Sequence, residues 1–197
     1  MKPAWNSAVR QKIADVLLIE RFEIVSRNTR PYIADVLLIL LALALSAVTL
    51  VGYDSITDDA LRVLLWPHAK ITEAFYHITL PYQNGIGYVA LERSFIISPA
   101  CMGVRFIIML FSMTICFFVR RFRGLHKIVF FALSLVGSIA VGVVASCVRI
   151  IGSIPLLSTD QFTVIHAGTG VMIYLITLVG VYILMKRITG GFQYEKQ

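Results

Sequence analysis

The middle of the chain reads "MGVRFIIMLFSMTICFFVRRFRGLHKIVFFALSLVGSIAVGVVASCVRI" at residues 102–150. Two apolar runs, Met102–Val119 and Ile128–Ile150, flank the basic segment "RRFRGLHK" at residues 120–127. A helix needs about 20 apolar residues to cross the hydrocarbon core of a bilayer, and both runs are close to that length. The sequence therefore predicts two transmembrane helices joined by a short, positively charged loop.

Two further apolar runs, Ile33–Val51 and Phe162–Met185, are also long enough to cross a membrane. Of the 197 residues, 58% are hydrophobic and 15% are charged, which is more apolar surface than a soluble domain of this size buries. We expect an all-α integral membrane protein with about four transmembrane helices, and a single transmembrane domain over residues 33–197. A cleaved signal peptide is the alternative for the first run, but the 32 residues before it favour a retained span.

The charge pattern predicts how the spans are oriented. The net charge is +7, and the basic residues fall in short blocks beside the apolar runs, which argues for a lipid bilayer rather than nucleic acid as the partner. Six Lys or Arg precede residue 33, a second block lies at 120–127, and "MKR" closes the last run. By the positive-inside rule we expect a multi-pass protein of the cell membrane, with both termini and the 120–127 loop cytoplasmic and residues 52–100 outside.

The segments outside the spans have patterns of their own. Residues 1–32 alternate apolar and charged groups at helical spacing, which predicts a cytoplasmic amphipathic helix. The heptapeptide "IADVLLI" occurs in this segment and again in the first span, and the duplication has no assigned role. Residues 52–100 predict a small extracytoplasmic cap, with an interfacial helix broken at Pro67, a turn at Asn84-Gly85 and a β-hairpin reversing near Glu92-Arg93.

Polar and small residues recur at helical spacing along three predicted spans, so each span is expected to have one polar face. These faces hold Cys101, Arg105, Ser112 and Cys116 in the second span; Ser134, Ser138, Gly142, Ser146 and Arg149 in the third; and His166, Gly170, Tyr174 and Thr177 in the fourth. Small residues on such faces let membrane helices approach closely, which accounts for many of them as packing positions. The ionisable groups differ, because the predicted topology brings Cys101, Arg149 and His166 to the same outer surface.

These three side chains have the chemistry of an acyl-transfer site. Cys101 is expected at a helix N-terminus, where free backbone N–H groups and the helix dipole stabilise a thiolate. Arg105, four residues later, would add a cation about one turn away. His166 is suited to exchange protons with the thiol and the leaving group, and Arg149 to stabilise an oxyanion.

A structural disulfide is an alternative to this interpretation. Cys101 and Cys147 both lie near the predicted outer face and are candidates for a disulfide. Thiol labelling distinguishes the two ideas, because a reactive Cys101 supports the enzyme and a bridge to Cys147 excludes it. We predict no metal site and no cofactor, because the spacing of His68, His77 and His166 matches no ligand pattern.

At these residues the sequence resembles the exosortase and archaeosortase family of membrane-embedded cysteine transpeptidases. The family pattern has Cys-x-Gly at the outer start of one span, Arg-Ile at the outer end of a later span and His at the outer start of the next. Here these motifs are "ACMGVRF", with Cys101 and Gly103; "SCVRIIG", with Arg149; and "VIHAGTG", with His166. The resemblance covers about residues 60–187, and "WPHAKITEAF" and "GYVALE" look most like the compact exosortase K type.

The resemblance implies a membrane-anchored protein substrate with a C-terminal sorting signal, made of a short motif, a transmembrane helix and a basic tail. It implies cleavage just outside the membrane through a thioester acyl-enzyme on Cys101. Many members have Asn three residues before the arginine, where this chain has Ser146, and many have more spans. The alternative from a different class is a non-enzymatic accessory or assembly protein, with Cys101 and Cys147 as structural residues. The substrate motif, the acceptor that resolves the thioester and the oligomeric state are not fixed by the sequence.

Overall fold

The computed structural model describes residues 32–53, 55–90, 95–156 and 162–194, with no side chains described for residues 156, 162–167 and 191–194. Within these residues, four helical segments are long and apolar enough to cross a membrane: Tyr32–Tyr53, Pro99–Arg121, His126–Ser153 and Gly168–Gly190. The protein is therefore an all-α multi-pass membrane protein, as the sequence predicts. The amphipathic helix predicted for residues 1–32 lies almost wholly outside the described residues.

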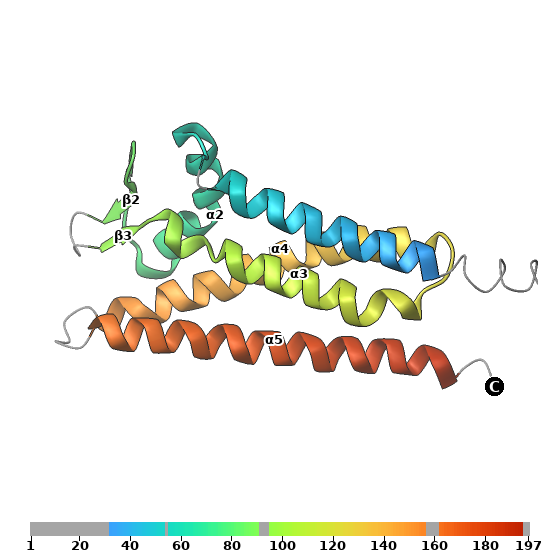
Figure 1. Ribbon diagram of the computed structural model, residues 1–197. Helices are drawn as coiled ribbons and strands as arrows, with labels where there is room; N and C mark the ends of the chain where they lie inside the picture. Colours follow the sequence, from blue (N-terminus) through green and yellow to red (C-terminus); the bar gives the residue numbers. More distant parts are fainter. Residues whose placement is uncertain (1–31, 54, 91–94, 157–161, 195–197) are drawn as a thin grey trace, which may run out of the picture.

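The first span, Tyr32–Tyr53, is followed by a cap and then by the rest of the bundle (Figure 1). The later elements are α2 (Asp58–Tyr76), β1 (Tyr82–Gln83), β2 (Gly87–Ala90), β3 (Phe95–Ile97), the 3₁₀ turn η1 (Pro99–Met102), α3 (Val104–Phe118), η2 (Val119–Arg121), α4 (His126–Ser153), η3 (Ile154–Leu156) and α5 (Phe162–Tyr194). The first span, α3, α4 and α5 run along one another, and α2 with the sheet sits at one end.

Small and polar residues set how closely the long helices pack, as their sequence pattern predicts. Ser46 of the first span and Ser112 of α3 share a hydrogen bond of 3.1 Å between their hydroxyl oxygens. Gly142 of α4 lies against Ile107 of α3, and a Cβ at this glycine would collide with the isoleucine side chain. Phe111 and Ile115 of α3 are buried in an apolar cluster with residues of the first span and α4. The α3 helix is therefore packed between the first span and α4.

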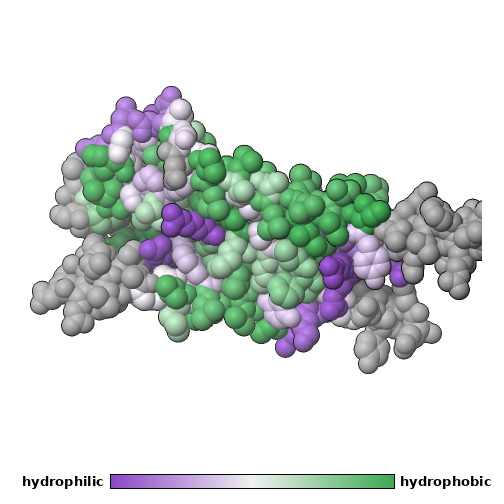
Figure 2. Space-filling view, in the orientation of Figure 1, coloured by the Kyte–Doolittle hydropathy of each residue, from purple (hydrophilic) through white to green (hydrophobic). Residues whose placement is uncertain are grey.

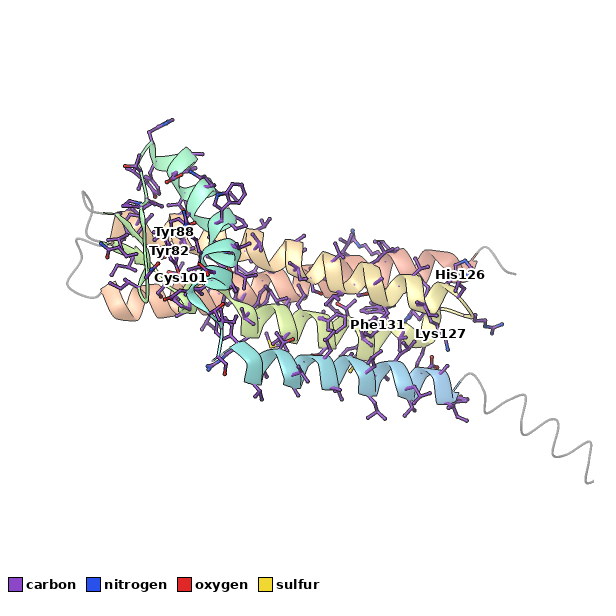
Figure 3. The ribbon with its side chains drawn as sticks, turned by 90° about the horizontal axis from the view of Figure 1, so that it is seen from above. Tyr82, Tyr88, Cys101, His126, Lys127 and Phe131 are labelled. Atoms are coloured by element: carbon purple, nitrogen blue, oxygen red, sulfur yellow. The ribbon has the colours of Figure 1, made fainter. Side chains whose placement is uncertain are left out.

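The two ends of the bundle differ in chemistry. Figure 3 shows Cys101 at the cap end beside Tyr82 and Tyr88, and His126 with Lys127 at the opposite end. At that opposite end Lys127 forms a buried ion pair with Asp35, near the start of the first span. The last helix also ends there (Figure 1). The start of the first span, the basic loop and the end of α5 thus share one end, and its assignment to the cytoplasm stays a prediction.

The cap contains the predicted hairpin and one strand more. Strands β2 and β3 pair antiparallel, with Tyr88 opposite Ile97 and Ala90 opposite Phe95, so the hairpin is confirmed. Its turn, at residues 91–94, lies outside the described residues. The Asn84-Gly85 turn is also confirmed, with Gly85 at φ +77°, but it joins β2 to a two-residue strand β1 that we did not predict.

The helix predicted to break at Pro67 instead continues through it. The α2 helix runs from Asp58 to Tyr76 with Pro67 inside. A proline removes the hydrogen bond to the carbonyl four residues earlier, here that of Val63, whose residue is 71% exposed. The inner face of α2, including Leu65 and Ala69, packs in the core of the cap and fixes the helix direction. Tertiary packing therefore outweighs the local cost of the proline.

His68 is buried on the inner face of α2, and this burial makes the cap sensitive to acid. Burial lowers the pKa of His68 below 6.5, with only partial opposition from the Leu64 carbonyl. Below pH 6.5 the unfolded chain therefore binds a proton that the folded cap does not, so the free energy of unfolding falls as the pH drops. The loss is at most about 1.4 kcal/mol per pH unit until the folded pKa is reached.

We expect His68→Leu to lack this part of the acid sensitivity between pH 7.5 and pH 5. Thermal unfolding of the detergent-solubilised chain at both pH values measures the effect. His77→Asn is the matched control, because His77 is exposed at the end of α2 and asparagine tolerates its left-handed φ of 53°. An equal loss of acid sensitivity in both variants would contradict the assignment to His68.

Candidate functional site

Cys101 lies in the 3₁₀ turn at the start of the Pro99–Arg121 segment, ahead of the α3 helix. It is the third residue of η1, and its backbone N–H donates to the Ser98 carbonyl at 2.9 Å. Gly103 follows with a left-handed φ of +64°, and α3 begins only at Val104. The prediction that Cys101 starts the polar face of this helix is therefore wrong, because the Gly103 conformation changes the direction of the chain between Cys101 and Arg105.

The thiol of Cys101 is partly exposed and packs against the core of the cap. That core is built from α2, the sheet, Met102 and Ile150. The thiol lies near the Ser98 hydroxyl, with 3.9 Å between Oγ and Sγ. The cap, rather than α3, thus holds the cysteine in place.

Ser146 connects the cysteine turn to two other helices. Its buried hydroxyl lies 3.2 Å from the Met102 carbonyl, to which it donates, and 3.3 Å from the Tyr174 hydroxyl of α5. Gly103 permits this contact, because a Cβ there would collide with the Ser146 hydroxyl and lie 2.7 Å from the Tyr174 hydroxyl. The predicted supporting residues Gly103 and Ser146 are therefore in direct contact with each other.

Arg149 lies one turn beyond Ser146 on α4 and reaches towards α5. Its Nη1 donates to the Tyr174 hydroxyl at 3.4 Å, and its guanidinium carbon is 5.7 Å from the centre of the Tyr174 ring. It also passes closely over Gly170, where a Cβ would lie 2.6 Å from Arg149 Nε. The glycine leaves the space that the guanidinium occupies. Arg149 is thus held at the junction of η1, α4 and α5 rather than directed into lipid.

A pocket of about 530 Å³ opens beside this junction. Its wall includes Ala100 and Gly103, on either side of Cys101 in the chain, together with Arg149 and Tyr174. Arg105 also lines the pocket and is exposed. Hydrophobic side chains, including Phe106 and Met109 of α3, form much of the remaining wall. The pocket therefore combines cationic groups with an apolar surface next to the cysteine turn.

Two tyrosines contribute to this site in ways that the sequence did not reveal. Tyr174 stacks on Phe106, with ring centres 4.4 Å apart, and its hydroxyl contacts both Ser146 and Arg149. The sequence placed Tyr174 on a polar face but assigned it no role. Tyr53, at the end of the first span, donates to the Pro99 carbonyl and so contacts the turn that holds Cys101. Only the three-dimensional contact identifies Tyr53, because it lies 46 residues before Pro99.

The position of His166 is described only by its backbone. It lies in α5 four residues before Gly170, which is one helical turn along the same face. Its side chain lies outside the described residues, so the predicted approach to Cys101 and Arg149 is untested.

The three cysteines of the chain are all free thiols. Cys147 is buried in α4, and Cys116 is exposed on α3. The alternative disulfide between Cys101 and Cys147 is therefore not formed in this structure. Among the described residues, no group of three His, Cys, Asp or Glu side chains is placed to hold a metal ion.

Comparison of the chain with protein-family models, with curated proteins and with solved structures finds no match.

Proposed function

We propose that the chain is a membrane-embedded cysteine transpeptidase or protease of the exosortase type. The observation that carries the proposal is the junction at the cap end of the bundle. There Ser146 and Arg149 of α4 and Tyr174 of α5 meet the turn that bears Cys101. Its substrate would be an exported protein that is anchored in the same membrane and has a sorting signal at its C-terminus.

The first half-reaction makes a thioester. His166 takes the proton of the Cys101 thiol, and the sulfur forms a bond to the carbonyl carbon of the scissile peptide. The carbon–nitrogen bond then breaks, and the leaving amine takes the proton back from His166. In the second half-reaction water or an amine attacks the thioester carbonyl, the carbon–sulfur bond breaks, and the thiol recovers its proton.

Arg149 acts on the negative charge that develops on the carbonyl oxygen. A guanidinium is always charged and offers several donors in a fixed plane, so it stabilises an oxyanion with little rearrangement. The contacts with Tyr174 and Gly170 hold this side chain in one place. Arg105 adds a second cation at the pocket. It would attract either the thiolate of Cys101 or a negative charge on the substrate.

We take the pocket as the route by which a membrane-anchored substrate reaches the cysteine turn, because its wall includes Ala100 and Gly103 of that stretch of the chain. A transmembrane signal would rest against the apolar wall that includes Phe106 and Met109, while the extended motif before it would reach the cysteine turn. We assign this end of the bundle to the outside of the membrane from the positive-inside rule, with both termini cytoplasmic.

The test is processing of a partner in proteoliposomes that contain the full chain. The partner is a membrane-anchored protein with a short C-terminal motif, a transmembrane helix and a basic tail. Mass spectrometry of the partner should find a new C-terminus outside the membrane, and a hydroxylamine-sensitive adduct should map to Cys101. An intact partner together with an unmodified Cys101 would favour the non-enzymatic accessory protein instead.

A substitution at Gly170 tests whether the position of Arg149 matters, because it moves the arginine side chain without replacing it. We expect Gly170→Ala to slow processing by about 100-fold, because the added methyl group would displace the guanidinium by a fraction of an ångström to about 1 Å. Gly168→Ala is the matched control on the same helix, because a Cβ there meets none of the described side chains or backbone atoms within 4 Å. Equal rates of processing in the two variants would show that the close approach of Gly170 to Arg149 has no effect on the reaction.

A further inference from the structure

A second pocket, of about 690 Å³, lies at the basic end of the bundle, opposite Cys101. It is formed between the start of the first span and the loop that joins α3 to α4. Its charged lining residues are Arg120, Arg123, Lys127 and Asp35, and Tyr32 and Phe122 add aromatic rings. The space-filling view shows hydrophilic surface at this end, next to apolar surface along the side of the bundle (Figure 2). The proposed acyl-transfer chemistry makes no use of this pocket.

The charges of this pocket do not balance. Lys127 and Asp35 are both buried and form an ion pair, so their charges compensate each other. Arg120 and Arg123 are exposed and take part in no ion pair among the described residues. The pocket therefore carries two guanidinium groups available to an anion. Guanidinium groups bind phosphate oxygens in a bidentate manner, so two of them suit one phosphate better than one carboxylate.

The depth of the pocket indicates where the phosphate comes from. Tyr32 begins one candidate span, and the next ends at Arg121, so the pocket lies at the boundary of the apolar bundle. Leu125 and Ile128 beside it are 72% and 60% exposed, as expected for side chains that contact lipid. A ligand at this boundary meets cations on one side and acyl chains on the other. This is the environment of a phospholipid headgroup, and basic pockets between membrane helices bind such groups.

We propose that this pocket binds the phosphate of an anionic phospholipid, with Arg120 and Arg123 as its ligands. The buried pair of Lys127 and Asp35 forms the floor of the site and joins the first span to α4. A bound lipid would connect the same two elements from outside. The proposal does not depend on the proposed enzymatic function.

Native mass spectrometry of the full chain in detergent tests the proposal. The delipidated protein is titrated with phosphatidylglycerol or with phosphatidylcholine of the same acyl chains, and the dissociation constant of the first bound lipid is compared. We expect phosphatidylglycerol to bind more tightly. Arg120→Gln and Arg123→Gln should each weaken it about fivefold, and the double variant about 25-fold. Arg120→Lys should fall between wild type and Arg120→Gln, because it keeps the charge but not the planar fork.

Arg121→Gln is the matched control, because Arg121 lies in the same loop, does not line the pocket and instead lies over the Phe118 ring. It should bind phosphatidylglycerol as wild type does. An equal loss in this variant would overturn the proposal by showing general charge attraction. No preference over phosphatidylcholine would overturn it by showing that the pocket does not recognise the negative charge of the lipid. Binding of glycerol 3-phosphate as tight as that of the lipid, with the same dependence on the arginines, would overturn the lipid source. The lipid-free thermal midpoint of each variant verifies that it is folded.

Discussion

Replacing Cys101 by alanine is expected to reduce processing of a membrane-anchored partner by roughly 10⁴-fold or more. In the proposed mechanism the thioester needs this sulfur, and the remaining groups only transfer protons, stabilise charge and position the substrate. The measurement is the amount of partner with the new C-terminus, determined by mass spectrometry against a cleaved standard. The hydroxylamine-sensitive adduct should disappear in the same variant.

The other two cysteines provide the matched controls for this prediction. Cys116→Ala changes an exposed residue of α3, and Cys147→Ala changes a buried residue of α4. Cys116→Ala should process the partner at the wild-type rate. Cys147→Ala is expected to lower stability slightly, because it removes a buried sulfur, with the processing of the folded protein maintained. Processing that survives Cys101→Ala would remove the basis for the proposed enzyme.

Gly103→Ala is expected to have the second-largest effect, and it acts on folding as well as on the site. An alanine there would need a left-handed φ of +64° and would place its Cβ against the hydroxyls of Ser146 and Tyr174. The backbone strain costs about 1–2 kcal/mol, and crowding in a packed region about 1–3 kcal/mol. We expect the free energy of unfolding in detergent to fall by about 2–5 kcal/mol, with loss of processing at temperatures where the variant is folded.

Gly124→Ala separates the two parts of that cost. Gly124 has a similar φ of +56°, but a Cβ there meets no atom of the described part of the chain within 4 Å. Only the strain of about 1–2 kcal/mol should therefore appear, and processing should be unchanged. If both variants lose the same stability, then the close approach of Gly103 to Ser146 and Tyr174 contributes nothing.

The membrane architecture was predictable because lipid imposes a length and a composition on every span. Ile33–Val51 and Ile128–Ile150 fall inside the helices Tyr32–Tyr53 and His126–Ser153. The polar face of α4, which is buried at Ser134, Ser138 and Ser146, was predictable from helical spacing alone. The inside-or-outside assignment follows from the basic blocks and stays a prediction.

The cap was harder to predict, because its short elements depend on packing rather than on periodicity. The α2 helix continues through Pro67 because Leu65 and Ala69 pack against the cap core on either side of it. The strand β1 has only two residues, Tyr82 and Gln83, too few for an alternation pattern to be seen. Pairing with β2 is what makes it a strand.

The candidate site was predictable in its members but not in its geometry. Gly103, Ser146 and Arg149 were singled out in the sequence, and the contacts through Tyr174 join them. The position of Cys101 was mistaken, since helical spacing assumes an unbroken helix and the left-handed Gly103 breaks it. One φ angle is not visible in a pattern of apolar and polar residues.

The contacts of Ser146 also determine when the site is completed during synthesis. Ser146 follows Met102 by 44 residues and precedes Tyr174 by another 28, so the cysteine turn leaves the ribosome several seconds before its α5 partner. Tyr76 of α2 donates to the Ile151 carbonyl, so this hydrogen bond forms only after a further 75 residues have been synthesised. A nascent chain therefore carries the thiol before it has the arginine held against α5. The α5 helix, which is synthesised after α4, completes this junction, so premature termination before α5 yields a membrane protein with a cysteine but without the Arg149–Tyr174 contact.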